Sequence, residues 1–425
     1  MSTLIIGAGV SGYGAAAYLR ANGAQVRVSE RAKLRPEEAQ RFLELGVELC
    51  DTGHDLSHLA GVTQVIVSPG ISAAHPLLVA ARERNLEVLS EIDLALRASR
   101  ARLIAVTGTN GKSTTCAMIG HLLRRLGHGA SVGGNFGDPP TLMLAQGRME
   151  EFLVLELSSY QLETSTLVRP EAAIFTSFSH DHIARHGTLA AYFAAKWRLF
   201  AELPSGSLAI IPDAVYSQAK ALGFAPLNSE VTQITSASYL RRLAPPSLPE
   251  PQNQLNAGFA LCAVAHLLKR SPADLSPFLA DFRGLPHRCE QIGTIDMQSV
   301  INDSKSTNVE STLVALDSQR RPVILLMGGQ GKEESYCPIL KALDKIALLV
   351  TFGASGSTIA KELGGGLPVQ EFPTLKNAMD QIGGIIAKHR CGVLFSPGCA
   401  SFDEFRNYEE RGDYFHRAIS PLLDT

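Results

Sequence analysis

Short runs of apolar residues alternate with longer amphipathic stretches along almost the whole chain. The short runs are rich in β-branched residues and have no polar face, which is typical of strands buried inside parallel sheets. They predict strands at Thr3–Ile6, Gln25–Val28, Gln64–Val67, Leu103–Val106, Phe152–Leu157, Ala172–Thr176, Leu208–Ile211, Val323–Met327, Leu348–Phe352 and Val393–Ser396. Turn residues and helical patterns follow these runs, so we expect an α/β fold with mostly parallel sheets.

Two breaks in this pattern indicate domain boundaries. A basic stretch at Ala98–Ala101 precedes a fresh strand, and a Gly-Leu-Pro turn interrupts the chain at Gly284–Pro286. The length of 425 residues allows two to four domains, at about 100–200 residues each. The segment Pro245–Pro251 is predicted to be an exposed loop inside the middle domain, because a helical pattern at Asn256–Arg270 follows it.

Composition excludes several classes of protein. With 45% apolar residues the chain is not disordered or fibrous, and a formal charge of -2 gives no support for nucleic-acid or membrane-surface partners. No run reaches the roughly 18 apolar residues of a membrane helix, and the first cation, Arg20, comes too late for a signal peptide. Seven scattered cysteines without a CxxC pair favour free thiols in a reducing cytoplasm over disulfides or a zinc site.

The first glycine loop follows the first predicted strand. Gly7-Ala8-Gly9-Val10-Ser11-Gly12 matches GxGxxG, and Glu30 lies 18 residues after Gly12, at the end of the next strand. Such glycines let the backbone approach a diphosphate at a helix N-terminus. The loop therefore indicates NAD(P) or FAD, another nucleotide diphosphate, or a purely structural turn.

A second glycine loop is more specific. An apolar strand runs into Gly108-Thr109-Asn110-Gly111-Lys112-Ser113, and the helical pattern Thr114–Leu126 follows. Backbone N–H groups can bind phosphates there, Lys112 can reach the β- and γ-phosphates, and Ser113 can bind Mg²⁺. The loop departs from GxxxxGK[ST] because Val106 stands at the first glycine. Two phosphate loops suggest one nucleotide that donates energy and another that bears the substrate. An NAD-dependent oxidoreductase and a non-catalytic nucleotide switch are the alternatives.

Three further positions offer metal or acid–base chemistry. Glu156 ends a strongly apolar strand, where a carboxylate needs a cation or donor partner, so it fits a Mg²⁺ role. The His180-Asp181-His182 turn can bind Zn²⁺, supply one Mg²⁺ ligand or be an exposed turn. On its amphipathic helix, Lys196 is by residue type alone a solvated surface lysine.

Taken together, the motifs GTNGKST, LELSSYQLE, SHDH…AAKWRLF, LPHRCE, INDSKSTN and SPGCASFDEFRNYEERG, in this order, resemble those of the Mur ligases over essentially the whole chain. The first two favour the D-glutamate-adding member of that family, with a related ATP-dependent amide ligase, such as another Mur ligase, as the alternative. The resemblance implies a Rossmann-like domain for the UDP sugar at 1–97, a central P-loop-type ATP-binding domain at 98–286 and a C-terminal Rossmann-like domain at 287–425. It also implies a monomeric, cytoplasmic enzyme of peptidoglycan and cell-wall synthesis, with no nucleic-acid or membrane partner.

The reaction that the resemblance implies is an ATP-dependent amide ligation. ATP phosphorylates the L-alanyl carboxylate of UDP-N-acetylmuramoyl-L-alanine, the amine of D-glutamate attacks the acyl phosphate, and a tetrahedral intermediate expels phosphate. The implied ATP-binding residues are Gly108, Thr109, Asn110, Gly111, Lys112, Ser113, Thr114, Asn256, Arg288 and Asp303. Two Mg²⁺ ions are implied, one at Ser113 and Glu156 and one at His182 near a carbamylated Lys196. The implied catalytic residues are Lys112, Glu156, His182 and Lys196.

The substrate residues are implied in the same way. The UDP-sugar residues are Gly7, Gly9, Val10, Ser11, Gly12, Glu30, Arg31, Ser68, Gly70, Asn135, Ser158 and Gln161. The D-glutamate residues are Lys305, Thr307, Lys332, Ser401 and Tyr408. Three features depart from the family pattern: Tyr408 stands where Phe is common, Glu30 replaces a small hydroxyl residue, and Gly137-Asp138-Pro139-Pro140 interrupts the region after Asn135. We therefore expect altered uridine contacts and a reshaped sugar pocket.

Overall fold

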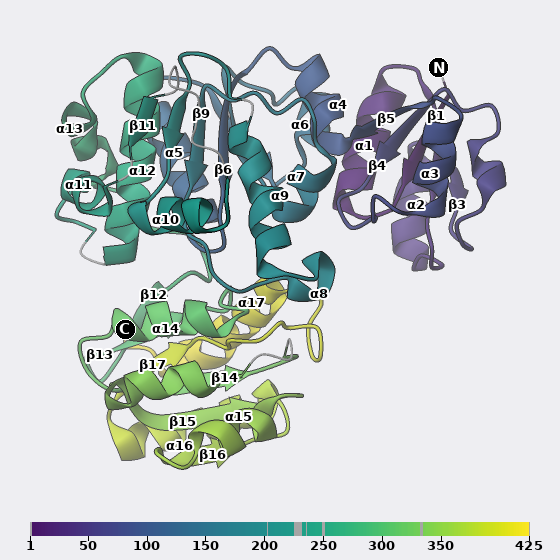
Figure 1. Ribbon diagram of the computed structural model, residues 1–425. Helices are drawn as coiled ribbons and strands as arrows, with labels where there is room; N and C mark the ends of the chain where they lie inside the picture. Colours follow the sequence, from purple (N-terminus) through teal and green to yellow (C-terminus); the bar gives the residue numbers. More distant parts are fainter. Residues whose placement is uncertain are drawn as a thin grey trace. The chain divides into compact units, whose positions relative to one another are not determined.

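The computed structural model describes residues 2–201, 203–224, 232–234, 236–248, 251–331 and 335–424. The chain forms two compact units, Met1–Phe282 and Arg283–Thr425. The first unit contains two separate sheets and the second contains one, and helices flank each sheet (Figure 1). In the described part of the chain, no helix is long and apolar enough to cross a membrane.

The N-terminal sheet has the order β3-β2-β1-β4-β5, and all its strands are parallel. Its elements are β1 (Ser2–Ile6), α1 (Val10–Ala21), β2 (Gln25–Ser29), α2 (Pro36–Glu44), β3 (Glu48–Cys50), η1 (Leu56–Leu59), β4 (Gln64–Val67), α3 (Pro76–Glu83), β5 (Glu87–Ser90) and α4 (Glu91–Ala98). Alternate β1 residues enter two cores: Ile5 packs with α1 residues, while Leu4 and Ile6 pack with α3 residues. Both faces are buried, which explains the uninterrupted apolar run.

The middle sheet has the order β11-β10-β9-β6-β8-β7 and is also parallel. Its elements are β6 (Arg102–Thr107), α5 (Lys112–Arg125), β7 (Ala130–Gly134), α6 (Pro140–Ala145), β8 (Phe152–Glu156), α7 (Ser159–Thr164), β9 (Ala172–Phe175), α8 (Ile183–His186), α9 (Leu189–Ala201), β10 (Leu208–Ile210), α10 (Asp213–Ala221), β11 (Thr232–Ile234), α11 (Ala237–Leu243), α12 (Pro251–Leu268), α13 (Pro272–Leu275) and η2 (Ser276–Leu279). Because β6 lies between β8 and β9, the loops after these three strands meet at one edge.

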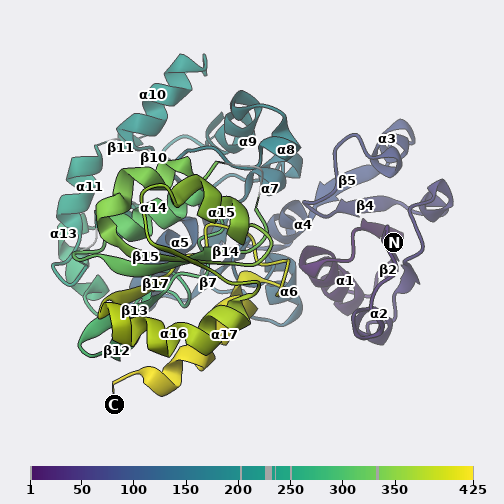
Figure 2. The same ribbon diagram turned by 90° about the horizontal axis from the view of Figure 1, so that it is seen from below.

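The sheet of the second unit has the order β12-β13-β17-β14-β15-β16, and Figure 2 labels the strands from β12 to β15 in that order. Its elements are β12 (Glu290–Ile295), β13 (Gln298–Asn302), α14 (Val309–Asp317), β14 (Val323–Gly328), η3 (Cys337–Lys345), β15 (Ile346–Phe352), α15 (Gly356–Leu363), β16 (Val369–Glu371), α16 (Leu375–His389), β17 (Gly392–Phe395), α17 (Tyr408–Ile419) and η4 (Ser420–Leu422). Only the β12–β13 pair is antiparallel among the pairs of this sheet.

The predicted α/β class and all ten predicted strands are confirmed, with ends that differ by at most two residues. The strands that the pattern missed are β3, β5, β7, β11, β12, β13 and β16, which are short, polar or glycine-containing. The exposed loop predicted at Pro245–Pro251 is partly wrong, because Leu248 packs into the core beside α12. The three domain boundaries stay a prediction.

Candidate active site

The second glycine loop connects the central strand β6 to α5. Gly111 is the N-cap of α5, with a φ of 86°, and a Cβ there would lie 2.7 Å from Asn256 Oδ1. Gly108 has a φ of 140°, and a Cβ there would overlap the hydroxyl of Thr176. Both positions require glycine, because another residue would be strained by its backbone and blocked by its neighbours.

The chain after β9 fixes the path of this loop. The N–H of Thr109 donates to Ser177 O at 2.8 Å, and the N–H of Asn110 donates to Ser177 Oγ at 2.9 Å. The hydroxyl of Thr176 donates to Asn110 O at 2.6 Å. The first turn of α5 contains Lys112, Ser113 and Thr114. Backbone N–H groups in the first turn of a helix are the ones that bind phosphate at helix N-termini.

A buried carboxylate lies beside the start of α5. Glu156 ends β8 and is 2% exposed; its Oε2 accepts the hydroxyl of Ser113, and its Oε1 accepts Asn135 Nδ2 at 2.7 Å. The strand register pairs Glu156 with Val106 of β6. The carboxylate therefore lies at the end of the sheet where the second glycine loop begins. Lys112 Nζ donates to Thr109 O at 2.6 Å, so the ammonium folds over the same loop. These residues, predicted from separate motifs, are thus brought together.

The oxygen atoms of Ser113 and Glu156 fit a Mg²⁺ ion, which prefers oxygen ligands and usually keeps waters and substrate phosphates in its shell. Across the described residues, no cluster of three or more His, Cys, Asp or Glu side chains forms a complete metal cage. A metal bound here would therefore take most of its ligands from nucleotide and water.

Lys196 lies inside the molecule, although its helical context alone indicates a surface lysine. The side chain is 2% exposed, its Nζ donates to Gly108 O at 2.7 Å, and it lies 4.7 Å from the centre of the Tyr192 ring. Burial lowers the pKa of Lys196 well below its ordinary value; the charge of Lys112 lowers it further, against the opposing effects of Asp181 and Glu156. Burial and the charge of Lys112 thus both favour the uncharged form of this amine beside the phosphate loop.

Two tyrosines line this region, and the residue-type analysis did not single them out. Tyr192 OH lies 3.3 Å from Thr109 Oγ1, and its ring centre is 6.0 Å from that of His182. Tyr160 OH lies 3.2 Å from His182 Nδ1, and His182 itself has a φ of 56°. The signal for Tyr192 was its spacing: it precedes Lys196 by four residues on α9, so the two share one helix face.

The first glycine loop joins the ends of three strands of the N-terminal sheet. Gly7, with a φ of 101°, follows β1, and a Cβ at Gly12 would overlap Gly7 O. The hydroxyl of Ser68, after β4, donates to Gly7 O at 3.2 Å. Glu30, after β2, accepts the N–H of Ala8 on Oε2 at 2.7 Å. The loop therefore lies where the strand order reverses between β1 and β4, a usual place for nucleotides.

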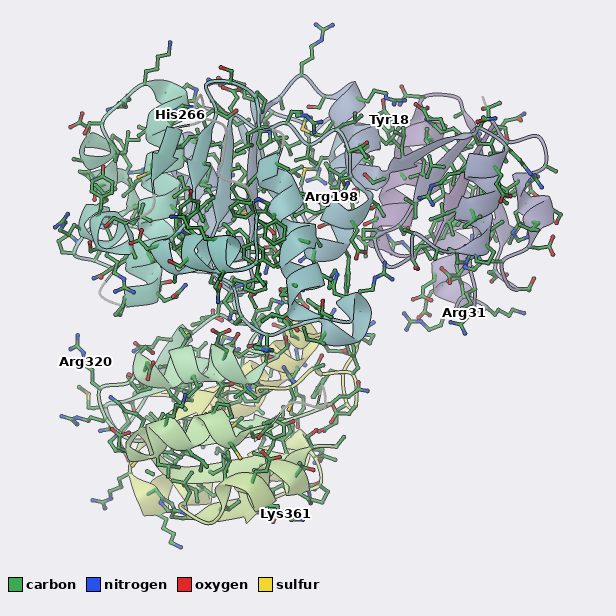
Figure 3. The ribbon with its side chains drawn as sticks, in the orientation of Figure 1. Tyr18, Arg31, Arg198, His266, Arg320 and Lys361 are labelled. Carbon is green, nitrogen blue, oxygen red and sulfur yellow. The ribbon has the colours of Figure 1, made fainter. Side chains whose placement is uncertain are left out.

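Other predicted UDP-sugar residues surround this loop. Val10 is 68% exposed in the first turn of α1, which also contains Ser11, and Arg31 is exposed at the edge of the unit (Figure 3). Glu30 Oε1 also accepts the N–H of Arg31 at 2.7 Å, so this carboxylate satisfies backbone groups on both sides. Arg185 of α8 reaches toward the carbonyl of Gly70 at 3.5 Å, which connects the N-terminal sheet to the region of His182.

Ser158 and Gln161 form a capping box at the start of α7. The Gln161 N–H donates to Ser158 Oγ at 3.3 Å, and Gln161 Oε1 accepts the Ser158 N–H at 3.0 Å. This local pairing explains the LELSSYQLE spacing as a helix start. The inserted Gly137–Pro140 segment forms a turn closed by the Gly134 N–H on Asp138 O at 3.1 Å.

A second set of predicted residues lies in the C-terminal unit. Asp303 is buried; its Oδ2 accepts the hydroxyls of Ser306 at 2.5 Å and Ser396 at 2.7 Å, and its Oδ1 accepts the Cys289 N–H at 3.0 Å. Burial raises the pKa of Asp303, against these hydrogen bonds. Arg288, beside Cys289, is half-buried.

The predicted D-glutamate residues lie on two loops of this unit. Lys305 Nζ is 4.4 Å from the centre of the Tyr408 ring; Thr307 is half-buried in the loop of Lys305, and Ser401 is buried in the loop after β17. Lys332 lies outside the described residues.

Sequence reasoning missed Arg411, which joins these two loops. Arg411 is 1% exposed and donates to the carbonyls of Cys399 at 3.0 Å, Ala400 at 3.2 Å and Ser304 at 2.8 Å, and to Ser304 Oγ at 3.1 Å. Burial lowers its pKa to about 10, so the guanidinium stays charged at neutral pH.

Two protein-family models match the parts of the chain that contain the two glycine loops. The Mur ligase middle domain matches residues 106–238, and the Mur ligase MurD-like, N-terminal domain matches residues 1–90. A UDP-N-acetylmuramoylalanine–D-glutamate ligase of Gloeobacter violaceus is 36% identical over 98% of this chain and 98% of its own. MurF of Acinetobacter baumannii shares the fold, with a TM-score of 0.61 at 17% identity, covering 95% of this chain and 92% of that one. The UDP-N-acetylmuramate–alanine ligase of Thermotoga maritima has a TM-score of 0.59 at 19% identity, covering 99% and 100%. On the full-length identity to such ligases, the chain belongs to the Mur ligase family.

Proposed function

We propose that this protein joins D-glutamate to the L-alanyl carboxylate of UDP-N-acetylmuramoyl-L-alanine and converts ATP to ADP and phosphate. Mur ligases are ATP-dependent enzymes that form amide bonds, and full-length relatives with 32–36% identity bear the name of the D-glutamate-adding enzyme. The observation that supports the proposal most directly is the carboxylate of Glu156, held by Ser113 of the phosphate loop and by Asn135 of the predicted sugar side. ATP and the acceptor substrate would thus both lie beside the buried carboxylate of Glu156.

The chemistry follows from the charges involved. An acceptor carboxylate must approach a triphosphate, and Lys112, folded over the loop, supplies a positive charge that stabilises the phosphorus-centred transition state. Transfer of the γ-phosphoryl group replaces a poor leaving group, oxide, with phosphate. The amine of D-glutamate then adds to the carbonyl carbon, loses a proton, and the tetrahedral species expels phosphate.

Mg²⁺, when bound, neutralises negative charge on the phosphate oxygens. Ser113 and Glu156 offer the oxygen ligands for one ion, and His182 offers an imidazole for a second. Tyr160 and Asp181 orient that imidazole, since they lie 3.2 Å from Nδ1 and 3.4 Å from Nε2.

Lys196 is proposed to react with CO₂. Burial lowers its pKa and so favours the uncharged amine, whose lone pair can form an N–C bond to CO₂ with loss of one proton, giving a carbamate. The carbamate would be an anion, which the charge of Lys112 stabilises, whereas that same charge disfavours the ammonium form of Lys196. A carbamate is supported here by the burial of Nζ and by its contact with Gly108 O.

The other predicted residues divide by substrate. The first glycine loop, with Ser68 and Glu30, is proposed to bind the UDP diphosphate and uridine. Asn256, Arg288 and Asp303 are proposed to contact ATP, while Lys305, Thr307, Ser401 and Tyr408, together with Lys332, are proposed to contact D-glutamate. We further propose a cytoplasmic monomer; all seven cysteines are free thiols, as a reducing compartment favours.

Phosphate release tests the function. The protein is mixed with MgATP and UDP-N-acetylmuramoyl-L-alanine, with and without D-glutamate; release should depend on D-glutamate and match amide product one to one. Release in neither reaction would overturn the proposal. ATP binding without D-glutamate-dependent release would favour the nucleotide switch, and an absorbance change of added nicotinamide cofactor would favour the oxidoreductase.

A further inference from the structure

A buried carboxylate connects α4, the helix between the first two sheets, to α6. Glu91 is 2% exposed at the start of α4, and its Oε1 accepts both the N–H of Thr141 at 2.8 Å and the hydroxyl of Thr141 at 2.5 Å. Within the described residues, Glu91 Oε2 is buried and has no hydrogen-bond partner. A carboxyl group is costly in such a place, so the two bonds to Thr141 must offset part of its desolvation.

The same threonine is the contact point for α1. A Cβ on Gly14 of α1 would lie 2.8 Å from Thr141 Oγ1 and 3.1 Å from Pro139 Cβ, so the glycine lets the two helices approach closely. Glu91 holds the Thr141 hydroxyl by its hydrogen bond and thereby fixes the surface on which α1 packs. Because α1 begins directly after the first glycine loop, the position of that loop depends on this packing.

From Thr141 the contacts continue to the phosphate loop. The turn before α6 is closed by the Gly134 N–H on Asp138 O at 3.1 Å, and it contains Asn135. The side chain of Asn135 donates to Glu156 Oε1 at 2.7 Å, and Glu156 accepts the hydroxyl of Ser113. A continuous series of contacts therefore joins the two glycine loops through α6.

We propose that Glu91 is a positioning residue that, through Thr141, sets the distance between the first glycine loop and the Asn135–Glu156 pair. This inference rests on the proposed function, since it assumes one acceptor that spans both places. UDP at one end binds the first loop, while the alanyl carboxylate at the other must reach the phosphoryl donor. A misplacement of about 1 Å at such a site can lower a rate about 100-fold. The ATP residues proposed on α5 and α12 pack mainly on each other, with Thr115 Oγ1 3.4 Å from Asn256 Oδ1, so we expect them to move less than the acceptor contacts.

The test compares ligands that span the two places with a ligand that does not. In the full-length protein we expect Glu91→Ala to raise the Kd and KM of UDP-N-acetylmuramoyl-L-alanine about tenfold, with the Kd of UDP alone and the KM of ATP within about twofold. Glu91→Gln retains an oxygen acceptor for Thr141 and should bring the acceptor constants back to within about threefold of the wild type. Gly14→Ala, which presses a methyl group onto Thr141, should match Glu91→Ala, and adding Thr141→Ala should relieve part of that effect.

Asp93→Asn is the matched control. Asp93 lies on the same helix and is also buried, but it accepts the N–H groups of Thr166 and Leu167 instead of α6. The Kd of UDP-N-acetylmuramoyl-L-alanine for this variant should stay within about twofold of the wild type. Equal losses of UDP and acceptor binding in the Glu91 and Gly14 variants, or no loss of acceptor binding in either, would overturn the inference. If Glu91→Ala does not fold, the acceptor and UDP binding constants of Gly14→Ala still test the inference. Because these are binding constants, they stay informative if D-glutamate-dependent phosphate release is absent, a result that would instead reject the proposed function.

Discussion

The two glycine loops of this protein share a backbone design and differ in the side chains around them. Each follows a central parallel strand, leads into a helix, and needs glycine at a positive φ, at Gly7 in the first loop and at Gly108 and Gly111 in the second. Around the first loop, the carboxylate of Glu30 satisfies backbone N–H groups. Around the second, Lys112, Ser113, Glu156 and a buried Lys196 converge.

The difference shows how one backbone solution serves two tasks. Glycine turns and helix N-termini are enough to hold a diphosphate, and the first loop adds little else. The second loop places a cation, a hydroxyl and a carboxylate together, where charge would change in the proposed reaction. Binding should therefore be sensitive to shape at the first loop, and catalysis to charge at the second.

The largest effect is expected for Lys112→Ala. Removal of this ammonium should lower kcat about 1000-fold, because one preorganised donor contributes about 10²–10³ in rate. Affinity for UDP should not change, since the first loop is untouched. Phosphate release and UDP calorimetry measure the two quantities. Near-normal turnover would contradict the role given to Lys112.

Lys196→Ala should lower kcat about 100-fold, equivalent to about 2.7 kcal/mol, and short carboxylates such as formate or acetate should restore part of the activity. The physical reason is that the proposed carbamate is an anion that a small acid can replace. Lys220→Ala is the control, because Lys220 also lies over a tyrosine, 4.6 Å from the Tyr216 ring, but on the exposed side of α10. Full activity of Lys196→Ala without rescue would show that no carbamate is needed.

A pair of glycine substitutions should separate the loops. Gly12→Ala would place a methyl group against Gly7 O and should raise the acceptor KM about tenfold, about 1.4 kcal/mol, with the ATP KM unchanged. Gly111 has a φ of 86° and lies against Asn256. Gly111→Ala should therefore raise the KM of ATP and leave the acceptor KM unchanged. Gly384→Ala, with open space at its Cβ, serves as the control in the other unit. If both variants raised both KM values together, the two loops would not bind different nucleotides.

The last effect concerns the stability contributed by Glu91, at the contact between α4 and α6. Burial raises the pKa of Glu91 from 4.5 to about 7, against the two bonds from Thr141. The folded protein therefore binds this proton more tightly than the unfolded chain, so the stabilisation is complete below about pH 4.5 and is lost as the pH rises to about 7. Relative to wild type, the free energy of unfolding of Glu91→Gln should rise by about 1 kcal/mol per pH unit inside that window.

Urea unfolding of both proteins at pH 5, 6, 7 and 8 measures this difference. It should change from pH 5 to 7 and level off by pH 8. A constant difference over the whole range would show that Glu91 titrates alike in the folded and unfolded chains.

The sequence was sufficient for the buried strands and the loops after them, because parallel strands covered on both faces have an unmistakable apolar pattern. Edge strands such as β3 and β16 lack that pattern, since one side of each faces no partner strand. The burial of Lys196 could not be derived from its helix alone; it results from packing against the phosphate loop, far away in sequence. Tyr192 and Arg411 were missed for the same reason, as their partners lie on other loops.

Arg411 has a consequence for how the C-terminal unit can move. One guanidinium joins the segment around Ser304 to the segment at Cys399–Ala400 through four hydrogen bonds, so the two segments should shift as a single rigid piece. A lysine has too few donors, in the wrong geometry, to hold both. If the amino acid binds to these two segments as proposed, side-chain exchanges on them should alter which amino acid is accepted. The spacing between the segments would stay the same, because Arg411 sets it.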